Sequence, residues 1–221
     1  MRATLAIATL LIPFLSADAT LTSPDGAIRV EFTVDEAGMP RYGITRAGET
    51  VLAASELGLV RDDTDLSRGL MLLRSGPIEP VTDRYELLTG KRRHVTYRAN
   101  RQVHELADAR GVRVDVIFQV SDDGVAFRYA LPATSGPAAT APRTILEERS
   151  SFRFPAGTRA WLQPMSVAKS GWKRANPSYE EHYEMDVPAG TPSTLGAGWV
   201  FPALFRTGAT WVALTETAVE A

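Results

Sequence analysis

Hydrophobic and polar residues alternate along much of the chain, and a clear example lies close to the N-terminus. The even positions of 28–34 hold Ile, Val, Phe and Val, while the odd positions hold Arg, Glu and Thr. Because successive side chains of a strand point to opposite faces, this pattern predicts a half-buried β-strand. A turn is expected over 35–40, followed by shorter strands over 41–44 and 50–52.

A second alternating region predicts a hairpin in the middle of the chain. The even positions of 112–120 hold four Val and one Phe, and the odd positions of 125–131 hold Val, Phe, Tyr and Leu. The intervening residues 121–124 read Ser-Asp-Asp-Gly. A Gly after Asp supplies the positive φ that such turns need. Another strand is expected around Val95 and Tyr97.

Helical periodicity is scarce. Residues 100–110 are long enough for two or three helical turns, but charged and polar residues leave them only a weak apolar face, so a strand or an irregular edge fits equally well. Strands at short spacing, separated by Gly, Pro and Asp, predict an all-β protein built as a large antiparallel sandwich with few or no helices. Residues 133–143 are small and include Pro, which favours a flexible surface loop.

The N-terminus has the features of a secretory signal peptide. Arg2 precedes an apolar run over 3–15, and Ala17-Asp18-Ala19 fits a small-x-small cleavage pattern. We expect a signal peptide over 1–19 and a single domain over 20–221. The alternative, a membrane anchor, is disfavoured because the run is too short to span a bilayer. This pattern is typical of a protein exported to the bacterial periplasm or secreted.

Composition narrows the class of protein. The chain has no Cys, so an exported protein of this sequence relies on its core and not on disulfides. Its net charge is −2, which gives no indication of a nucleic-acid partner or of an anionic membrane surface. The one basic run, Lys91-Arg92-Arg93, is interpreted as a solvated strand end.

The stretch from Trp161 to Phe205 differs from the rest of the chain. It holds three of the four Trp, two Tyr and five Pro, and most of it shows neither a helical nor a strand period. Long aperiodic segments are usually functional loops or disordered ones, and disordered segments are poor in aromatics. We therefore expect an ordered surface that meets a sugar, a metal or another domain.

Carboxylates in this stretch suggest two kinds of chemistry. Glu180, Glu181, Glu184 and Asp186 lie close together, and calcium prefers oxygen ligands on irregular backbone, but a solvated acidic turn has the same composition. Paired carboxylates for glycoside hydrolysis are also present, as Glu180-Glu181 and as Glu147-Glu148. Adjacent residues of an extended chain point apart, so neither pair is expected to be a complete catalytic set. Residues 147–148 are expected on an exposed strand.

Aromatic side chains are the natural partners of sugar rings, because their flat apolar faces stack on pyranose C–H groups. In this stretch the candidates for substrate binding are Trp172, Tyr179 and Tyr183, and Trp172 is expected to be the most exposed. Trp161 and Trp199 are equally well explained as anchors of a core or an interface.

The histidines do not suggest nucleophilic catalysis. No Gly-x-Ser-x-Gly setting accompanies them, so a catalytic triad is not expected. We expect His94 and His104 to be partly exposed residues of a sheet.

Several separated motifs resemble the N-terminal domain of glycoside hydrolase family 97. The 161–205 stretch resembles the end of that domain, and Leu21-Thr-Ser-Pro-Asp-Gly26 with the following strand is similar to its opening. The hairpin motif Asp122-Asp-Gly-Val-Ala-Phe-Arg-Tyr129 agrees, as do Ser55-Glu-Leu-Gly-Leu59 and Asp65-Leu66. The resemblance covers nearly all of the chain after the signal peptide.

The resemblance implies a fold and a setting. Family members are exported bacterial enzymes that act on α-glucosides or α-galactosides. They carry an N-terminal β-super-sandwich of the galactose-mutarotase type, a central (β/α)8 barrel with the catalytic carboxylates, and a small C-terminal β domain. The expected function is thus to pack on the catalytic barrel of the same polypeptide and to complete its active site.

The resemblance also implies a calcium ligand. In the family, one Glu from a Tyr-Glu-x-x-Tyr-like loop of the N-terminal domain reaches a calcium ion of the active site. Here the pattern is Tyr179-Glu180-Glu181-His182-Tyr183, which carries the role to Glu180, with Glu181 as the alternative register. Ala221 falls where the barrel is expected to begin. The chain alone is therefore expected neither to hydrolyse glycosides nor to hold calcium tightly, because one carboxylate cannot replace a multidentate shell.

The principal alternative is a free-standing carbohydrate-binding β-sandwich module. It predicts that the isolated chain binds sugar through Trp172 and its neighbours. A small complete enzyme of the mutarotase type needs a catalytic His and carboxylate in a groove, and the sequence gives His94 and His104 no such context.

Overall fold

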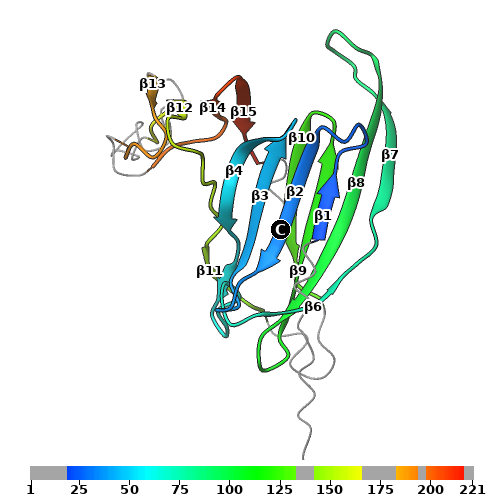
Figure 1. Ribbon diagram of the computed structural model, residues 1–221, viewed down its shortest axis with the longest axis vertical. Coiled ribbons are helices and arrows are strands. Elements are labelled where there is room, and N and C mark those ends of the chain that lie inside the picture. Colours follow the sequence, from blue (N-terminus) through cyan, green and yellow to red (C-terminus); the bar gives the residue numbers. More distant parts are fainter. Residues whose placement is uncertain (1–18, 133–141, 166–182, 194–197, 217–221) are drawn as a thin grey trace, which may run out of the picture.

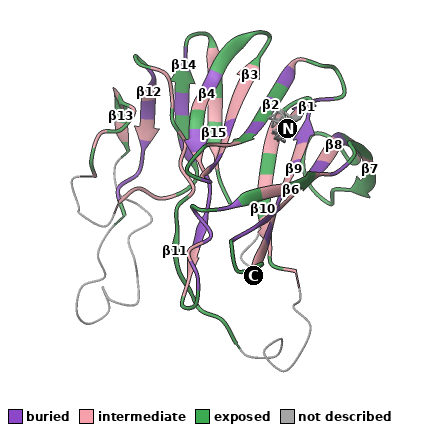
Figure 2. Ribbon diagram, turned by 60° about the horizontal axis from the view of Figure 1, so that its bottom comes forward, coloured by how far each residue is buried: buried purple, intermediate pink, exposed green. Residues whose placement is uncertain are grey.

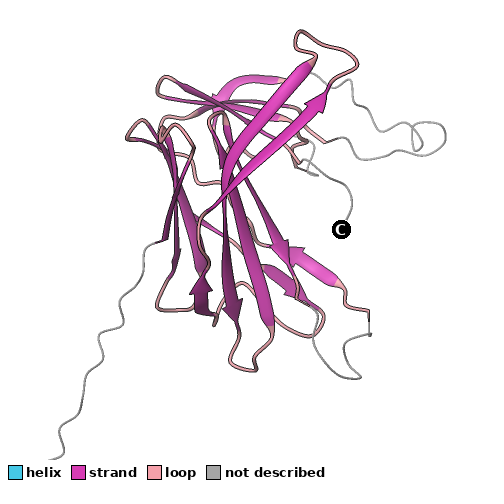
Figure 3. Cartoon of the chain, turned by 90° about the vertical axis from the view of Figure 1, so that its right-hand side faces the viewer, coloured by secondary structure: helices cyan, strands magenta, loops and turns pink. Residues whose placement is uncertain are grey.

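The computed structural model describes residues 19–132, 142–165, 183–193 and 198–216 (Figure 1). All regular structure in these ranges is β-strand, and none of it is helical (Figure 3). The prediction of an all-β antiparallel sandwich is therefore confirmed. Within the same ranges there is no helix with the length and apolarity needed to cross a membrane. The expected signal peptide over 1–19 lies almost entirely outside the described residues.

The first sheet is a meander of four neighbouring antiparallel strands. Its even positions over 28–34 are buried or half-buried, as the alternation predicts. The third and fourth strands are joined by Ala47 and Gly48, whose φ values of 50° and 84° give the two positive φ angles that a two-residue turn of this hand requires. The strands are β1 (Ala19–Thr22), β2 (Ile28–Val34), β3 (Pro40–Arg46) and β4 (Glu49–Glu56).

The second sheet packs behind the first. Four of its strands lie in the order β10-β9-β8-β6, and β7 also pairs with β8. The central hairpin is found where the sequence predicts it, with Asp122 and Asp123 at the turn. The strands are β6 (Met71–Ser75), β7 (Glu79–Glu86), β8 (His94–Ala107), β9 (Arg113–Ser121) and β10 (Gly124–Ala130).

The facing sides of the two sheets form the main hydrophobic core. Phe32 and Tyr42 from the first sheet meet Phe118 from the second, with ring centroids 6.0 and 5.7 Å from that of Phe118. Figure 2 shows buried residues alternating with exposed ones along these strands. Burial of these apolar side chains between the two sheets fixes the strand register, because a shift of one residue would turn them towards solvent.

His104 lies inside this core, which corrects the expectation of partial exposure. Its side chain is 1% exposed, and its ring stacks on Phe32 at a centroid distance of 4.2 Å. Its Nδ1 lies 3.0 Å from the Ser75 hydroxyl. Burial lowers the pKa of His104 to about 4, so the ring is neutral at physiological pH. His94, by contrast, is exposed at the end of β8.

Residues 149–153 run along the open edge of β4. The amide of Ser151 donates to the carbonyl of Glu56, and the amide of Ala53 donates to the carbonyl of Arg153. Just before this segment, β11 (Ile145–Glu148) pairs with β5 (Leu59–Arg61) and is exposed throughout, as predicted for residues 147–148. The segment covers the edge of the first sheet and leads into a third sheet.

The third sheet is small and has the order β13-β12-β14-β15. It lies at one end of the sandwich (Figure 1). We call it the small sheet. Its strands are β12 (Arg159–Leu162), β13 (Glu184–Pro188), β14 (Ala203–Thr207) and β15 (Thr210–Leu214).

Candidate functional site

The small sheet contains the two ends of the aromatic stretch identified in the sequence. Ala160 pairs with Phe205, and Trp161 pairs with Leu204, so residues far apart in the stretch become neighbours on adjacent strands. The stretch is therefore anchored by paired strands at both ends. Its centre, residues 166–182, lies outside the described residues.

One face of the small sheet is apolar and turned inward. Ala160, Leu162, Ala203 and Phe205 form a second buried cluster. Phe154 stacks on Phe205 with ring centroids 4.2 Å apart and also packs against the main core. Val212 of β15 likewise packs against both clusters, so these two side chains join the small sheet to the sandwich.

A hollow of about 990 Å³ lies on this inner side. Phe154, Phe205 and Leu214 line it from the cluster, and Trp199 and Phe201 line it from the segment before β14. The lining also includes polar residues of the 150–159 segment, so the hollow is mixed in character.

The opposite face of the small sheet presents an exposed aromatic and cationic cluster. The rings of Trp161 and Trp211 lie 4.8 Å apart at an interplanar angle of 41°. The guanidinium carbon of Arg206 lies 5.8 Å from the centroid of Trp161 and 5.6 Å from that of Trp211. These are cation–π distances. Trp211 nevertheless remains 53% exposed. We call Trp161, Leu204, Arg206 and Trp211 the outer cluster.

Further apolar side chains are exposed on the small sheet and on the segments that flank its strands. Met185 is 67% exposed on β13, and Tyr183, directly before that strand, is 44% exposed. Met165 and Phe201 are exposed as well. Large exposed apolar patches mark protein interfaces or ligand-binding grooves, so these side chains make the small sheet the candidate contact surface.

Of the predicted site residues, the structure describes Tyr183 alone, and its side chain is exposed. Its role in substrate binding stays a prediction. Trp199 packs against the second buried cluster and donates its indole N–H to the carbonyl of Thr191 at 2.9 Å, which makes it an anchor. Trp172, Tyr179, Glu180 and Glu181 lie outside the described residues.

Glu184 and Asp186, the acidic residues that follow the 166–182 segment, do not form a metal site with other described residues. Asp186 accepts a hydrogen bond from the Arg159 Nε at 3.1 Å and adopts a positive φ of 55°. No group of three or more His, Cys, Asp or Glu residues suited to a metal ion occurs among the residues that the structure describes. These residues alone do not fit a calcium shell.

Sequence reasoning missed Arg206 and Trp211. The residues of β14 alternate between buried and exposed, with Leu204 and Arg206 on the exposed phase. The sequence of β15 places Trp211 and Ala213 on one face and Val212 and Leu214 on the other. A large aromatic residue at a solvent-facing position of a strand could have indicated this surface from the sequence.

Comparisons with known proteins agree on one relationship. The profile of a family described as "Glycosyl-hydrolase 97 N-terminal" matches residues 21–221. A "Probable retaining alpha-galactosidase" of Streptomyces bingchenggensis (strain BCW-1) is 32% identical over 204 residues, which are 92% of this chain and 28% of that protein. The chain thus spans less than a third of the length of this curated relative.

Solved structures give the same picture. The crystal structure of a beta-arabinopyranosidase has a TM-score of 0.84 and 37% identity, and the match covers 91% of this chain and 32% of that one. A glycoside hydrolase family 97 enzyme from Pseudoalteromonas sp. strain K8, solved in complex with panose, has a TM-score of 0.65 and 21% identity over 85% of this chain and 26% of that one. At 21% identity, the similarity to this second structure shows a shared fold alone.

Proposed function

The chain belongs to the glycosyl-hydrolase 97 N-terminal family, and from this premise we propose that it is the N-terminal domain of a longer, exported, calcium-dependent glycoside hydrolase. Its role is to pack on the catalytic barrel of the same polypeptide and to complete the active site. The observation that carries the proposal is the exposed apolar surface of the small sheet, which borders the loop expected to reach the active site. The relatives are about three times longer than this chain, which leaves room for a catalytic domain.

The outer cluster is the surface that we assign to interdomain packing. Interfaces between domains of one chain bury about 600–1,500 Å² and are enriched in aromatics and Arg. Trp211, Met185 and Tyr183 supply such side chains on and beside one sheet face. Arg206, held over two indole rings, offers a planar donor to a carboxylate or a carbonyl of the facing domain.

For the substrate, we rank α-galactosides ahead of α-glucosides. The two relatives above 30% identity are named as a retaining alpha-galactosidase and a beta-arabinopyranosidase. A β-arabinopyranoside of the L series has the ring configuration of an α-D-galactopyranoside without its hydroxymethyl group. The relative solved with panose is only 21% identical and bears on the fold alone. Hydrolysis of aryl α-galactosides, β-L-arabinopyranosides and α-glucosides by the complete polypeptide tests the ranking.

The first experiment reads the coding sequence downstream of the Ala221 codon. An open frame that continues into several hundred residues of alternating strand and helix patterns is the expected result. A stop codon at that point would contradict the proposal. The free-standing carbohydrate-binding module would then become the better account, with the exposed indole of Trp211 as its candidate sugar platform.

The calcium role is tested in the complete enzyme. Glu180→Ala is expected to raise the calcium concentration needed for half-maximal activity and to lower turnover, without a change in thermal midpoint. Glu181→Ala tests the alternative register, and Glu148→Ala, at an exposed carboxylate of β11, is the matched control. An unchanged calcium requirement in both loop variants would overturn the assignment.

Export is tested by determining the N-terminal residue of the mature protein, which is expected to be Thr20.

A further inference from the structure

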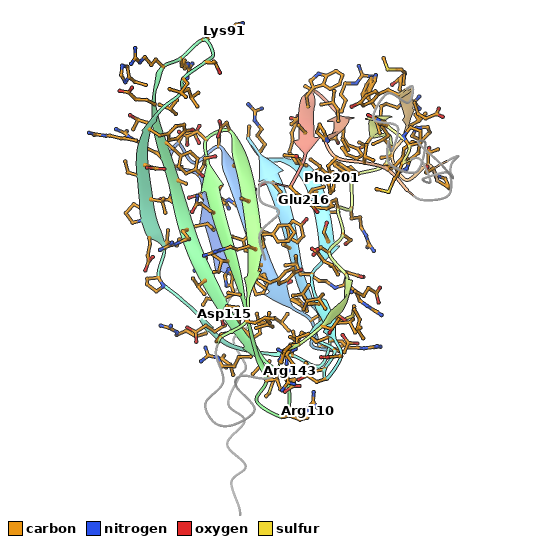
Figure 4. The ribbon with its side chains drawn as sticks, turned by 180° about the vertical axis from the view of Figure 1, so that it is seen from behind. Lys91, Arg110, Asp115, Arg143, Phe201 and Glu216 are labelled. Carbon is orange, nitrogen blue, oxygen red and sulfur yellow. The ribbon has the colours of Figure 1, made fainter. Side chains whose placement is uncertain are left out.

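The β7–β8 hairpin extends beyond the second sheet as an arm of only two strands. We define the arm as residues 82–98. The pairing of β9 with β8 starts at Ala99, so residues 94–98 of β8 pair with β7 alone. Figure 1 shows this hairpin projecting from the body, and Figure 4 shows Lys91 at its tip. A two-stranded ribbon without a third strand is marginally stable in water, so the arm would gain stability by binding a partner.

The end of the arm presents apolar side chains to solvent. Every residue from Thr82 to His94 is exposed. Leu88 is fully exposed, and Leu87 beside it is also exposed. The amide of Leu87 donates to the carbonyl of Arg93 at 2.8 Å, which closes the loop and keeps both leucines at the end of the hairpin. A single exposed leucine is ordinary, but two at the extreme end of a projecting arm form a distinct feature.

The arm is basic although the whole chain is acidic. It carries five Lys and Arg against two Asp and Glu, a net charge of +3, whereas the whole chain carries −2. Its basic residues gather near the leucines, with Lys91, Arg92 and Arg93 consecutive in the loop. Glu86 lies 3.5 Å from the Nε of Arg93 and 3.1 Å from the Nδ1 of His94. The net charge of the chain therefore conceals a local cationic surface.

We propose that the arm binds an anionic lipid surface. In this arrangement Leu87 and Leu88 enter the interfacial region, and Lys91, Arg92 and Arg93 contact phosphate headgroups. Apolar residues surrounded by basic ones are the combination that interfacial membrane binding uses. A hairpin end is small beside the roughly 800 Å² per partner of a standard protein interface, whereas a bilayer is extended and requires no matching shape. Two copies of the arm would repel each other, since each carries +3.

The test is co-sedimentation of the complete polypeptide with lipid vesicles. Vesicles of phosphatidylcholine with about one third phosphatidylglycerol are compared with phosphatidylcholine alone. The expected result is binding to the anionic vesicles only, with loss of binding in high salt because screening weakens the attraction. Arg92→Glu combined with Arg93→Glu should lower the affinity by more than about tenfold. Leu88→Ser should lower it several-fold.

A matched control separates the arm from overall charge. Arg29→Glu combined with Arg128→Glu changes the net charge equally at exposed positions of β2 and β10, outside the arm. This variant should retain most of the affinity. Equal losses in the two double variants, or no binding by the unmodified protein, would overturn the proposal. A third outcome would also overturn the proposal: the unmodified protein does not bind vesicles, and the arm variant loses its packing on the catalytic domain. The arm would then contact an acidic protein surface instead of a lipid.

Discussion

The two-sheet sandwich and the small sheet are built from the same alternating strands, but they complete their packing in different ways. In the sandwich the apolar faces of two sheets cover one another, and residues such as Phe118 and Leu106 have no exposed surface. The small sheet has one thin buried cluster, a hollow of about 990 Å³ on its inner side and the exposed indole of Trp211 on its outer side. The comparison teaches that burial is concentrated in the sandwich, whereas the small sheet leaves exposed the surface that we propose for a partner.

The largest expected effect contrasts one phenylalanine from each region. Phe118→Ala removes a fully buried ring between the two sheets and should cost about 3–5 kcal/mol in the free energy of unfolding. Phe205→Ala removes a ring that is 9% exposed from the thin cluster of the small sheet and should cost less, at or below the lower end of that range. Chemical denaturation of both variants measures the difference. Equal costs would show that the small sheet is as essential to the fold as the sandwich.

The next effect is the pH dependence that His104 gives to the sandwich. Its folded-state pKa of about 4 lies below the ordinary value of 6.5, so the unfolded chain binds the proton more tightly. Stability is therefore full above pH 6.5 and falls as the pH drops towards 4, by about 3 kcal/mol over this window. Unfolding measured from pH 7 to pH 4 tests this loss.

The control for this prediction is His104→Phe, which keeps a ring against Phe32 and removes the titrating group. Carboxylates such as Asp35 and Asp108, whose pKa values are lowered by hydrogen bonds, lose their contribution at lower pH in both proteins. The variant should therefore show a flatter profile between pH 6.5 and 4.5. Parallel profiles in the two proteins would rule out His104 as the source.

The smallest expected effect is on the stability of the outer cluster. Trp211→Ala removes an exposed ring, its contact with Trp161 and one cation–π contact, so it should change the unfolding free energy by no more than about 2 kcal/mol. In the complete polypeptide the same substitution should weaken domain packing, seen as separate thermal transitions for the two domains. A single unchanged transition would argue against an interface at this face.

The sequence predicts the sandwich well because its strands alternate with one face buried. The hairpin expected around residues 121–124 is present as β9 and β10. Residues 100–107, which fit a strand or a helix equally well, form a strand because they lie between β9 and the strands β6 and β7. Neighbouring strands decide such a case, and a single sequence does not show them.

His104 and the outer cluster show where pattern reasoning stops. On β8 the inward positions include the polar residues Gln102 and His104, while Val103 faces the other way. The Gln102 Nε2 donates to the carbonyl of Gly76, and the His104 Nδ1 lies within hydrogen-bond distance of the Ser75 hydroxyl. The buried Oε1 of Gln102 has no hydrogen-bond partner among the described residues. These contacts arise only after folding. Trp161 and Trp211 are 50 positions apart and meet only because β14 pairs with both β12 and β15.

Hydroxyl-radical footprinting of the complete polypeptide, without lipid, tests the central claim most directly. Trp211 and Met185 are more than half exposed on this chain alone, and Tyr85 on the arm is 45% exposed, which provides an internal reference. Indole and thioether side chains react at least as fast as phenol when solvent reaches them. If the small sheet packs on a catalytic domain, Trp211 and Met185 should be protected while Tyr85 is modified. Modification of Trp211 and Met185 at the rate of Tyr85 or faster would contradict the claim.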